Sequence, residues 1–352
     1  MSSQSCRLAA TVLAIACASL LLATALLAFP RTAFGHRQEG HANGRIIWSQ
    51  AGQTAARIVS ANPDGSDFRV LSDPPEGAFD IDPVPSPNGR RIIFERDTDD
   101  DAMIVLMRAD GSGERTIDTG CVDPCADDIN PTWAPDGRHV VFTRVVGPFD
   151  QPNDSARSAV LWSTDLAGGH LRRISQRGID GAYEDYRARW TPDGRTVTFT
   201  RIRNDPFNSA EFAMDANGAH VRQLTPWELD ADIYDLSQAR AGRTKGLIAF
   251  ETFGHGPPEG QSSNVATVPA GCRSLAACTR RIRYLTDNGA GPTASNNPAW
   301  SPDGTLIAFA EYDDVEPADI WTMRPDGSDR QRFTSTPDFH DFRPSWAPAL
   351  SW

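Results

Sequence analysis

One sequence pattern recurs along the chain and constrains its fold more strongly than any other feature. In four segments a Trp, or Pro85 in its place, is followed by a Pro-Asp-Gly or Pro-Asn-Gly turn and then by a β-rich run that ends in Phe. The Trp or Pro85 precedes that Phe by nine residues in every copy, as Trp300 precedes Phe309. The four segments span residues 83–94, 131–142, 189–199 and 298–309. A repeat with fixed internal spacing indicates one supersecondary unit that is used several times.

The turn chemistry of the repeat predicts that its strands pair as hairpins. Pro presets φ at the first corner of the turn, Asp or Asn accepts hydrogen bonds there, and Gly takes the left-handed conformation that closes it. We therefore assign structural roles to the carboxylates of these turns, which are Asp136, Asp193, Asp303 and Asp326. A third strand, a second turn and a fourth strand follow, as at residues 320–323, 325–328 and 332–334. Four short strands joined by hairpins make one blade of a β-propeller.

The number of repeats and the two ends of the repeated region predict a closed ring. First strands are expected at six positions, marked by Pro85, Trp133, Trp190, the neighbourhood of Ser237, Trp300 and Trp346. Residues 43–48 match a second strand without a first, and residues 341–346 match a first strand without a second. These two unpaired strands complete one blade together, which removes an open sheet edge. We therefore predict an all-β fold in which residues 43–352 form a single six-bladed β-propeller of four-stranded antiparallel blades, closed by the N- and C-terminal strands in one blade.

The repeat resembles that of a known family. The signature x-Pro-x-Trp-Ser-Pro-Asp-Gly-x-x-Ile-Ala-Phe, followed by Ile-Trp-x-Met-x-x-Asp-Gly-Ser, is similar to the WD-like repeat of the TolB-type β-propeller family, and residues 304–328 match it almost letter for letter. The resemblance covers about residues 43–348. It implies a six-bladed propeller that is usually exported and often serves as a protein-interaction scaffold. Because one fold hosts many functions, the resemblance does not imply the role of TolB itself.

The N-terminal segment differs in composition from the rest of the chain. Residues 8–29 form an apolar run that Arg7 precedes, and an A-x-G pattern at residues 33–35 offers a cleavage point. This arrangement predicts an export signal over residues 1–35 and a linker over residues 36–42, which places the product in the periplasm or outside the cell. The run is also long enough to span a bilayer. An uncleaved anchor formed by residues 8–29 therefore stays open as an alternative.

Four cysteines outside that segment form two pairs that are close in the sequence, Cys121 with Cys125 and Cys272 with Cys278. Exported domains form disulfides and cytosolic ones rarely do, so we predict that both pairs are disulfides that staple loops. Redox activity of a pair is the alternative. Neither pair has C-x-x-C spacing and no His cluster lies near them, which argues against a zinc site.

The charge balance excludes one class of partner. The chain has 34 Lys and Arg against 46 Asp and Glu, which gives a formal net charge of −12. Proteins that bind nucleic acid derive their affinity from clustered Lys and Arg. We therefore expect no nucleic-acid partner. We also expect the chain to be a monomer.

The most informative candidate site is acidic. Five residues before each first-strand marker stand Asp80, Asp128, Asp185, Asp232, Ser295 and Asp341. First strands line the centre of a propeller, so we expect these side chains, with His340, to form a binding ring around one channel mouth. Such a ring attracts a basic peptide or a cation, and Asp128, Asp185 and Asp341 are the candidate ligands of a Ca²⁺ ion, the one cofactor that this pattern suggests. The structural alternative is that each Asp caps the loop entering its strand by accepting backbone N–H bonds.

These features favour an exported, non-catalytic binding scaffold of the cell envelope, whose protein or peptide partner binds at the channel mouth or the long blade loops. Trp227 falls outside the repeat and is a candidate anchor for such a partner. The alternative is a carbohydrate-active lyase or hydrolase with a metal in the channel and His340 nearby. No G-x-S-x-G nucleophile motif occurs in the chain, which argues against a serine hydrolase.

Overall fold

Residues 43–122, 125–147, 158–176, 182–204, 206–253, 263–289, 291–313 and 316–349 are described by a computed structural model of the chain. The predicted export signal and the alternative anchor lie outside these ranges. Within them, no helix has the length and apolar character needed to cross a membrane.

The described chain consists almost entirely of short strands in antiparallel sheets. Four sheets have four strands each, in the orders β11-β10-β9-β8, β12-β13-β14-β15, β16-β17-β18-β19 and β20-β21-β22-β23. Their bounds are β8 Cys125–Trp133, β9 His139–Val146, β10 Ser158–Asp165, β11 Arg172–Arg173, β12 Tyr183–Trp190, β13 Thr196–Asn204, β14 Phe207–Asp215, β15 Arg222–Gln223, β16 Ala231–Leu236, β17 Leu247–Thr252, β18 Asn264–Pro269, β19 Arg283–Tyr284, β20 Ala294–Trp300, β21 Ile307–Tyr312, β22 Asp319–Met323 and β23 Gln331–Arg332. Two short helical turns, η3 (Trp227–Leu229) and α2 (Leu275–Thr279), lie between strands.

A fifth sheet has eight strands and contains both ends of the repeated region. Its order is β24-β1-β2-β4-β5-β6-β7, and β3 also pairs with β2. The bounds are β1 Asn43–Ala51, β2 Ala56–Ala61, β3 Arg69–Val70, β4 Phe79–Pro85, β5 Arg91–Asp97, β6 Ala102–Arg108, β7 Arg115–Thr116 and β24 His340–Pro348. The register between β2 and β4 consists of one parallel pair, Ala56 with Phe79. The sheet therefore divides at this point into two four-stranded groups, β24-β1-β2-β3 and β4-β5-β6-β7.

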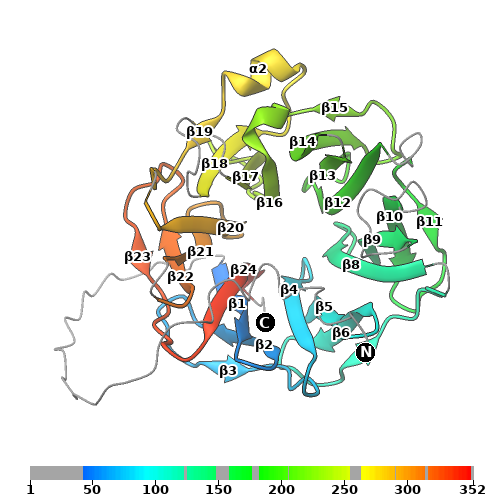
Figure 1. The fold of residues 1–352 in the computed structure, drawn as a ribbon, viewed down its shortest axis with the longest axis vertical. Coiled ribbons are helices and arrows are strands. Elements are labelled where there is room, and N and C mark those ends of the chain that lie inside the picture. Colours follow the sequence, from blue (N-terminus) through cyan, green and yellow to red (C-terminus); the bar gives the residue numbers. More distant parts are fainter. Residues whose placement is uncertain are drawn as a thin grey trace. The chain divides into compact units, whose positions relative to one another are not determined.

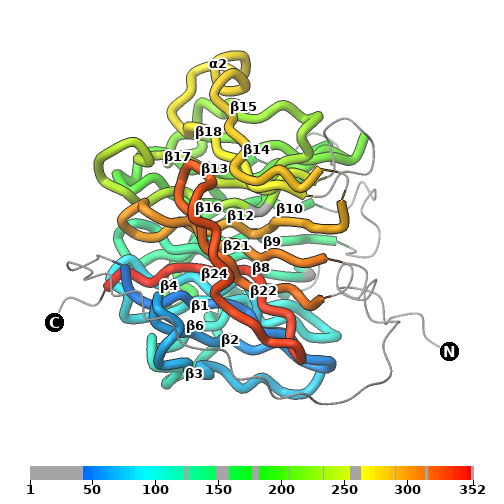
Figure 2. Tube along the Cα trace, turned by 90° about the vertical axis from the view of Figure 1, so that its left-hand side faces the viewer, coloured from blue at the N-terminus to red at the C-terminus, as the bar shows by residue number. Residues whose placement is uncertain are grey.

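The sheets are arranged around a common centre, as in a β-propeller (Figure 1). Strands β4, β8, β12, β16, β20 and β24 lie nearest the centre, and short strands such as β11, β15 and β23 lie at the periphery. Figure 2 shows the strands of neighbouring sheets running beside one another when the fold is turned by 90°. We refer to β4, β8, β12, β16, β20 and β24 as the inner strands.

The predicted pairing of the first and last strands is present. β1 pairs antiparallel with β24, and the register places Ile46 opposite Trp346 and Gln50 opposite Asp341. Strands from the two ends of the repeated region thus share one sheet.

The Phe that ends each β-rich run is a core residue. Phe94, Phe142, Phe199, Phe250 and Phe309 are all fully buried. Burying an aromatic side chain of this size stabilises the fold by roughly 1.5–3 kcal/mol relative to leaving it exposed. The recurring Phe therefore supplies each sheet with one large apolar contact to its neighbours.

Glycines in the turns before the outermost strands bring neighbouring sheets together. Gly111, Gly168, Gly218 and Gly327 have φ of +85°, +85°, +88° and +85°. A Cβ atom there would lie 2.4, 1.6, 2.5 and 2.4 Å from the carbonyl oxygens of Leu71, Asp118, Ile174 and Leu285. Each oxygen belongs to the segment that follows the outermost strand of the preceding four-stranded unit. Gly65 has a similar φ of +79° but no atom within 4 Å of the same point.

Candidate functional site

The six positions predicted to be equivalent do occupy equivalent places near the start of the inner strands. Each lies opposite a residue of the adjacent strand, in the pairs Asp80–Arg96, Asp128–Arg144, Asp185–Arg201, Asp232–Glu251, Ser295–Glu311 and Asp341–Gln50. The spacing in the sequence therefore reflects a true structural register, but the cross-strand neighbours determine what these side chains do.

Three of the predicted binding residues form buried ion pairs with these neighbours. The Arg Nε and Nη2 atoms lie 2.6 and 2.8 Å from the carboxylate oxygens of Asp80, 2.8 and 2.7 Å from those of Asp128, and 2.7 and 3.0 Å from those of Asp185. The three carboxylates are at most 2% exposed. Burial raises the pKa of Asp80 and Asp185, and the paired guanidinium groups counteract that rise. Their oxygens are thus occupied by guanidinium groups inside the fold and are not presented to a partner.

The remaining predicted residues are also engaged within the fold. Asp341 accepts hydrogen bonds from Gln50 Nε2 at 3.0 Å and from Thr336 Oγ1 at 2.7 Å, and Asp232 lies 3.4 Å from Arg187 Nε. His340 Nδ1 accepts a hydrogen bond from the backbone N–H of Ala318 at 3.2 Å. This bond requires Nδ1 to be unprotonated, and burial lowers the pKa of His340 in agreement with it.

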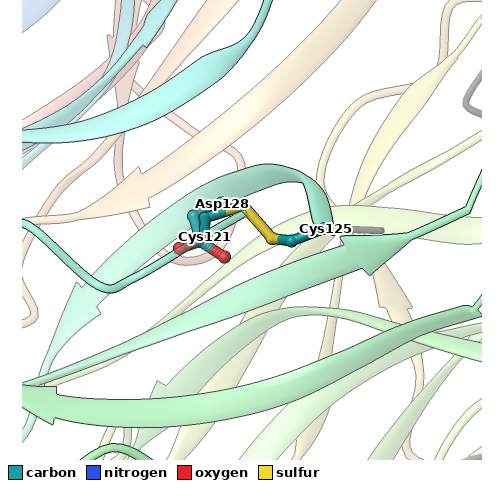
Figure 3. A group of neighbouring side chains, drawn as sticks. All are labelled: Cys121, Cys125 and Asp128. Atoms are coloured by element: carbon teal, nitrogen blue, oxygen red, sulfur yellow. A yellow bond between two sulfur atoms is a disulfide. The ribbon is translucent and has the colours of Figure 1, made fainter. Parts of the chain in front are cut away.

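The predicted calcium ligands Asp128, Asp185 and Asp341 belong to separate hydrogen-bond groups in the structure. Among the described residues, one group of three His, Cys, Asp or Glu side chains has potential ligand atoms within 4.8 Å of one another, and it consists of Cys121, Cys125 and Asp128 (Figure 3). Its sulfur atoms are joined in a disulfide and its carboxylate is bonded to Arg144 and Thr119. This group contains one of the three predicted ligands, and the calcium site stays a prediction.

The backbone-capping alternative is also realised differently from its prediction. Asp127, which directly precedes a predicted capping residue, accepts the N–H of Ala102 at 2.9 Å, as His340 accepts that of Ala318. Ala102 begins β6 and Ala318 directly precedes β22, so both bonds join an inner strand to the preceding unit. At these two positions the residue that caps the backbone stands one place before the predicted Asp.

One of the two predicted disulfides is present in the structure. Cys121 and Cys125 are bonded, as predicted. Cys272 and Cys278 are both buried and carry free thiols, so the second predicted disulfide is absent from the structure. Burial and a hydrogen bond to Cys272 raise the pKa of the Cys278 thiol to about 12. The Cys278 thiol therefore stays protonated beside Cys272, and the two sulfur atoms are not covalently joined.

A charge network that the repeat pattern did not predict lies at the centre of the sheets. Two residues after each Asp position, five inner strands carry a non-glycine residue with φ between 50° and 54°, at Asp82, Asn130, Arg187, Asn297 and Arg343. The strand register shifts around each of these residues, which marks a β-bulge. Bulges redirect side chains, and here they allow residues far apart in the sequence to meet.

Asp82 is the hub of this network. Its Oδ2 lies 2.9 Å from Arg343 Nη1, 3.3 Å from Arg187 Nη1 and 3.1 Å from Asn130 Nδ2. Burial alone would raise the pKa of Asp82, but the charges of Arg343, Arg187 and Arg189 outweigh it and hold that pKa below its usual value. The hub thus links inner strands β4, β8, β12 and β24 through one ionised carboxylate.

Two buried glutamates extend the network in matching ways. Glu95 Oε2 accepts the backbone N–H of Asn130 at 2.7 Å, and Glu251 Oε2 accepts that of Asn297 at the same distance. Burial and a neighbouring Asp raise the pKa of each glutamate to about 8. Each Glu therefore ties its strand to the bulge of the next unit with little negative charge at neutral pH.

A cavity of about 500 Å³ lies beside this network and receives residues from all six inner strands. Its apolar lining comes from the prolines and tryptophans of the repeat, including Pro85, Trp133, Trp190, Trp300 and Trp346. Its charged lining residues are Asp82, Asp235, Arg189, Arg240 and Arg343. None of the predicted binding residues lines it, because they stand at the opposite ends of the inner strands. A cavity of this volume with apolar walls and a few polar groups is typical of a ligand site.

The arrangement of sheets around this cavity defines a β-propeller, and known structures share it. They include TolB from Acinetobacter baumannii (TM-score 0.63, 20% identity, covering 87% of this chain and 67% of that one) and hydrazine synthase from Kuenenia stuttgartiensis (0.65, 14%, 87% and 47%). A putative TolB from Agrobacterium tumefaciens is also similar (0.58, 17%, 87% and 99%). The chain thus has a TolB-like propeller fold. No protein-family model and no curated protein matches its sequence.

Proposed function

We propose that the chain is an exported, non-catalytic binding scaffold of the cell envelope, with six propeller blades, and that a protein or peptide partner enters its central cavity. The blade count combines the four four-stranded sheets with the two four-stranded groups of the fifth sheet. The TolB-like fold supports a scaffold, and the apolar run at residues 8–29 supports export.

The observation that carries the proposal is the cavity itself. Every inner strand contributes to it, so its walls are held by hydrogen-bonded strands and require little ordering when a partner binds. Trp and Pro side chains supply rigid apolar contacts, and Trp is frequent among the residues that dominate binding energies.

The lyase or hydrolase alternative is less well supported. Its proposed residue, His340, does not line the cavity, and its Nδ1 is occupied by a backbone N–H. The described residues that line the cavity include no His, the side chain that most often transfers protons in catalysis.

Site-specific photo-crosslinking in the native envelope tests the proposal. A photo-reactive amino acid replaces Gln238, an exposed residue at the cavity, and in a control replaces Arg173, an exposed residue on outer strand β11. We expect position 238 of the full chain to crosslink to a protein that position 173 does not reach. Identical products at both positions, or none at position 238, would contradict a partner in the cavity.

A reporter fusion tests the export part separately. Alkaline phosphatase joined after residue 42 should be active in cells, because it folds only outside the cytosol, where its disulfides form. Removing residues 8–29 should abolish that activity. Activity that survives the deletion would show that this segment does not direct export.

A further inference from the structure

We infer that the cavity recognises a carboxylate group on a peptide. The inference rests on the proposed function and deepens it, because it assigns a charge and a chemical class to the ligand. It also reverses the expectation of a basic peptide, which depended on the Asp residues at the other ends of the inner strands.

The charge of the lining is the first argument. Three Arg residues and two Asp residues line the cavity, so its lining carries a net positive charge although the whole chain carries −12. Asp82 is occupied by Arg343 and Arg187. Asp235 accepts the backbone N–H of Trp300 at 2.8 Å and lies 3.6 Å from Arg189 Nε. The acidic groups of the lining are therefore already engaged.

Arg240 is the cation that remains available. It is exposed, and none of the described residues forms a hydrogen bond or ion pair with its guanidinium group. A guanidinium group binds a carboxylate through two parallel N–H bonds, which makes Arg suited to this ligand. The position of Arg240 at the cavity thus provides a binding group that the fold itself does not use.

The apolar part of the lining favours a peptide over a small anion. Prolines in or just after five of the inner strands, together with the Trp side chains, line the cavity beside its charged residues. Burying an apolar side chain of a ligand against this surface stabilises the complex, and inorganic anions have no apolar part to bury. A carboxylate carried by a short, partly apolar peptide segment satisfies both parts of the lining.

Binding of four acetylated peptides to the full chain tests the inference, with the intrinsic fluorescence of the cavity tryptophans as the readout. The probes are Ala-Pro-Leu-Ala with a free C-terminal carboxylate, the same peptide as an amide, and the amides Ala-Pro-Glu-Ala and Ala-Pro-Lys-Ala. We expect the Glu amide, the free acid or both to bind at least about tenfold more tightly than the Lys amide. The two carboxylate probes distinguish a side-chain carboxylate from a chain terminus.

Two charge-reversed variants localise the effect. Arg240→Glu should abolish the preference for carboxylate, whereas Arg173→Glu, an equal charge change on the outer strand β11, should leave it intact. Equal binding of all four peptides, or equal loss in both variants, would overturn the carboxylate assignment but leave a binding cavity. Failure of every peptide to bind, together with failure of the crosslink at position 238, would overturn both this inference and the proposed function.

Discussion

Replacing Asp82 by Asn tests whether the central charge network holds the inner strands together. Asn has nearly the shape of Asp and tolerates the left-handed backbone at this position, where φ is +52°. The change removes the negative charge that Arg343 and Arg187 share. The Asp82 side chain is 13% exposed, and the two Arg side chains are 18% and 15% exposed.

The expected cost follows from this burial. Removing one partner of a buried ion pair destabilises a protein by about 3–5 kcal/mol, because the other charge is left uncompensated. Asn keeps one acceptor oxygen, so we expect a loss near the lower end, about 3 kcal/mol. A domain of about 310 residues unfolds with an entropy of roughly 0.65 kcal/mol/K, so that loss lowers the midpoint of thermal unfolding by about 5 °C.

Asp329→Asn is the matched control. Asp329 also has a left-handed backbone, with φ of +53°, and pairs with Arg324, but the two side chains are 55% and 61% exposed. Exposed pairs contribute about 0–1 kcal/mol. Both variants are compared with the parent by urea denaturation and by thermal unfolding. Equal losses in the two variants would refute the argument that burial makes the Asp82 hub important.

Three further predictions concern other parts of the fold. In the folded protein the pKa of Glu95 is about 8, above its ordinary value of 4.5. The protonated Glu95 side chain therefore stabilises the fold fully below about pH 4.5, and this stabilisation is lost as the pH rises toward 8. Glu95→Gln should therefore gain stability relative to the parent between about pH 5 and 8 in urea titrations; a constant offset would contradict this. Gly168→Ala should destabilise more than Gly65→Ala, because only the first Cβ meets a carbonyl oxygen; equal melting temperatures would count against the sheet contact. Alkylation and mass spectrometry should label Cys272 and Cys278 only after unfolding, whereas a mass showing them joined would restore the second disulfide.

The repeated part of the fold could be predicted from the sequence because each repeat buries the same kinds of side chain at the same spacing. Trp133 and Phe142 have the same spacing in the sequence as Trp300 and Phe309, and both members of each pair are buried. The pairing of β1 with β24 could also be predicted, since the first repeat lacked a first strand and the last repeat lacked a second.

The site was harder to predict because its chemistry does not repeat. A signal for the Asp–Arg pairs was present, since Arg96, Arg144 and Arg201 each follow the repeat Phe by two residues. The central network carries no such signal, because one structural position holds Asp, Asn or Arg in different strands. Asp82 and Arg343 are 261 residues apart, and only the arrangement of the sheets around a common centre brings them into contact.

The pairing of β1 with β24 also determines when the protein can finish folding. Asp341 and Gln50, which are 291 residues apart, lie opposite each other, so the sheet that contains them stays incomplete until residues 340–348 have been synthesised. During that time the edge of β1 has unpaired backbone groups, which are a template for aggregation. Chain synthesis that stalls before β24 would therefore leave an intermediate whose exposed sheet edge favours aggregation.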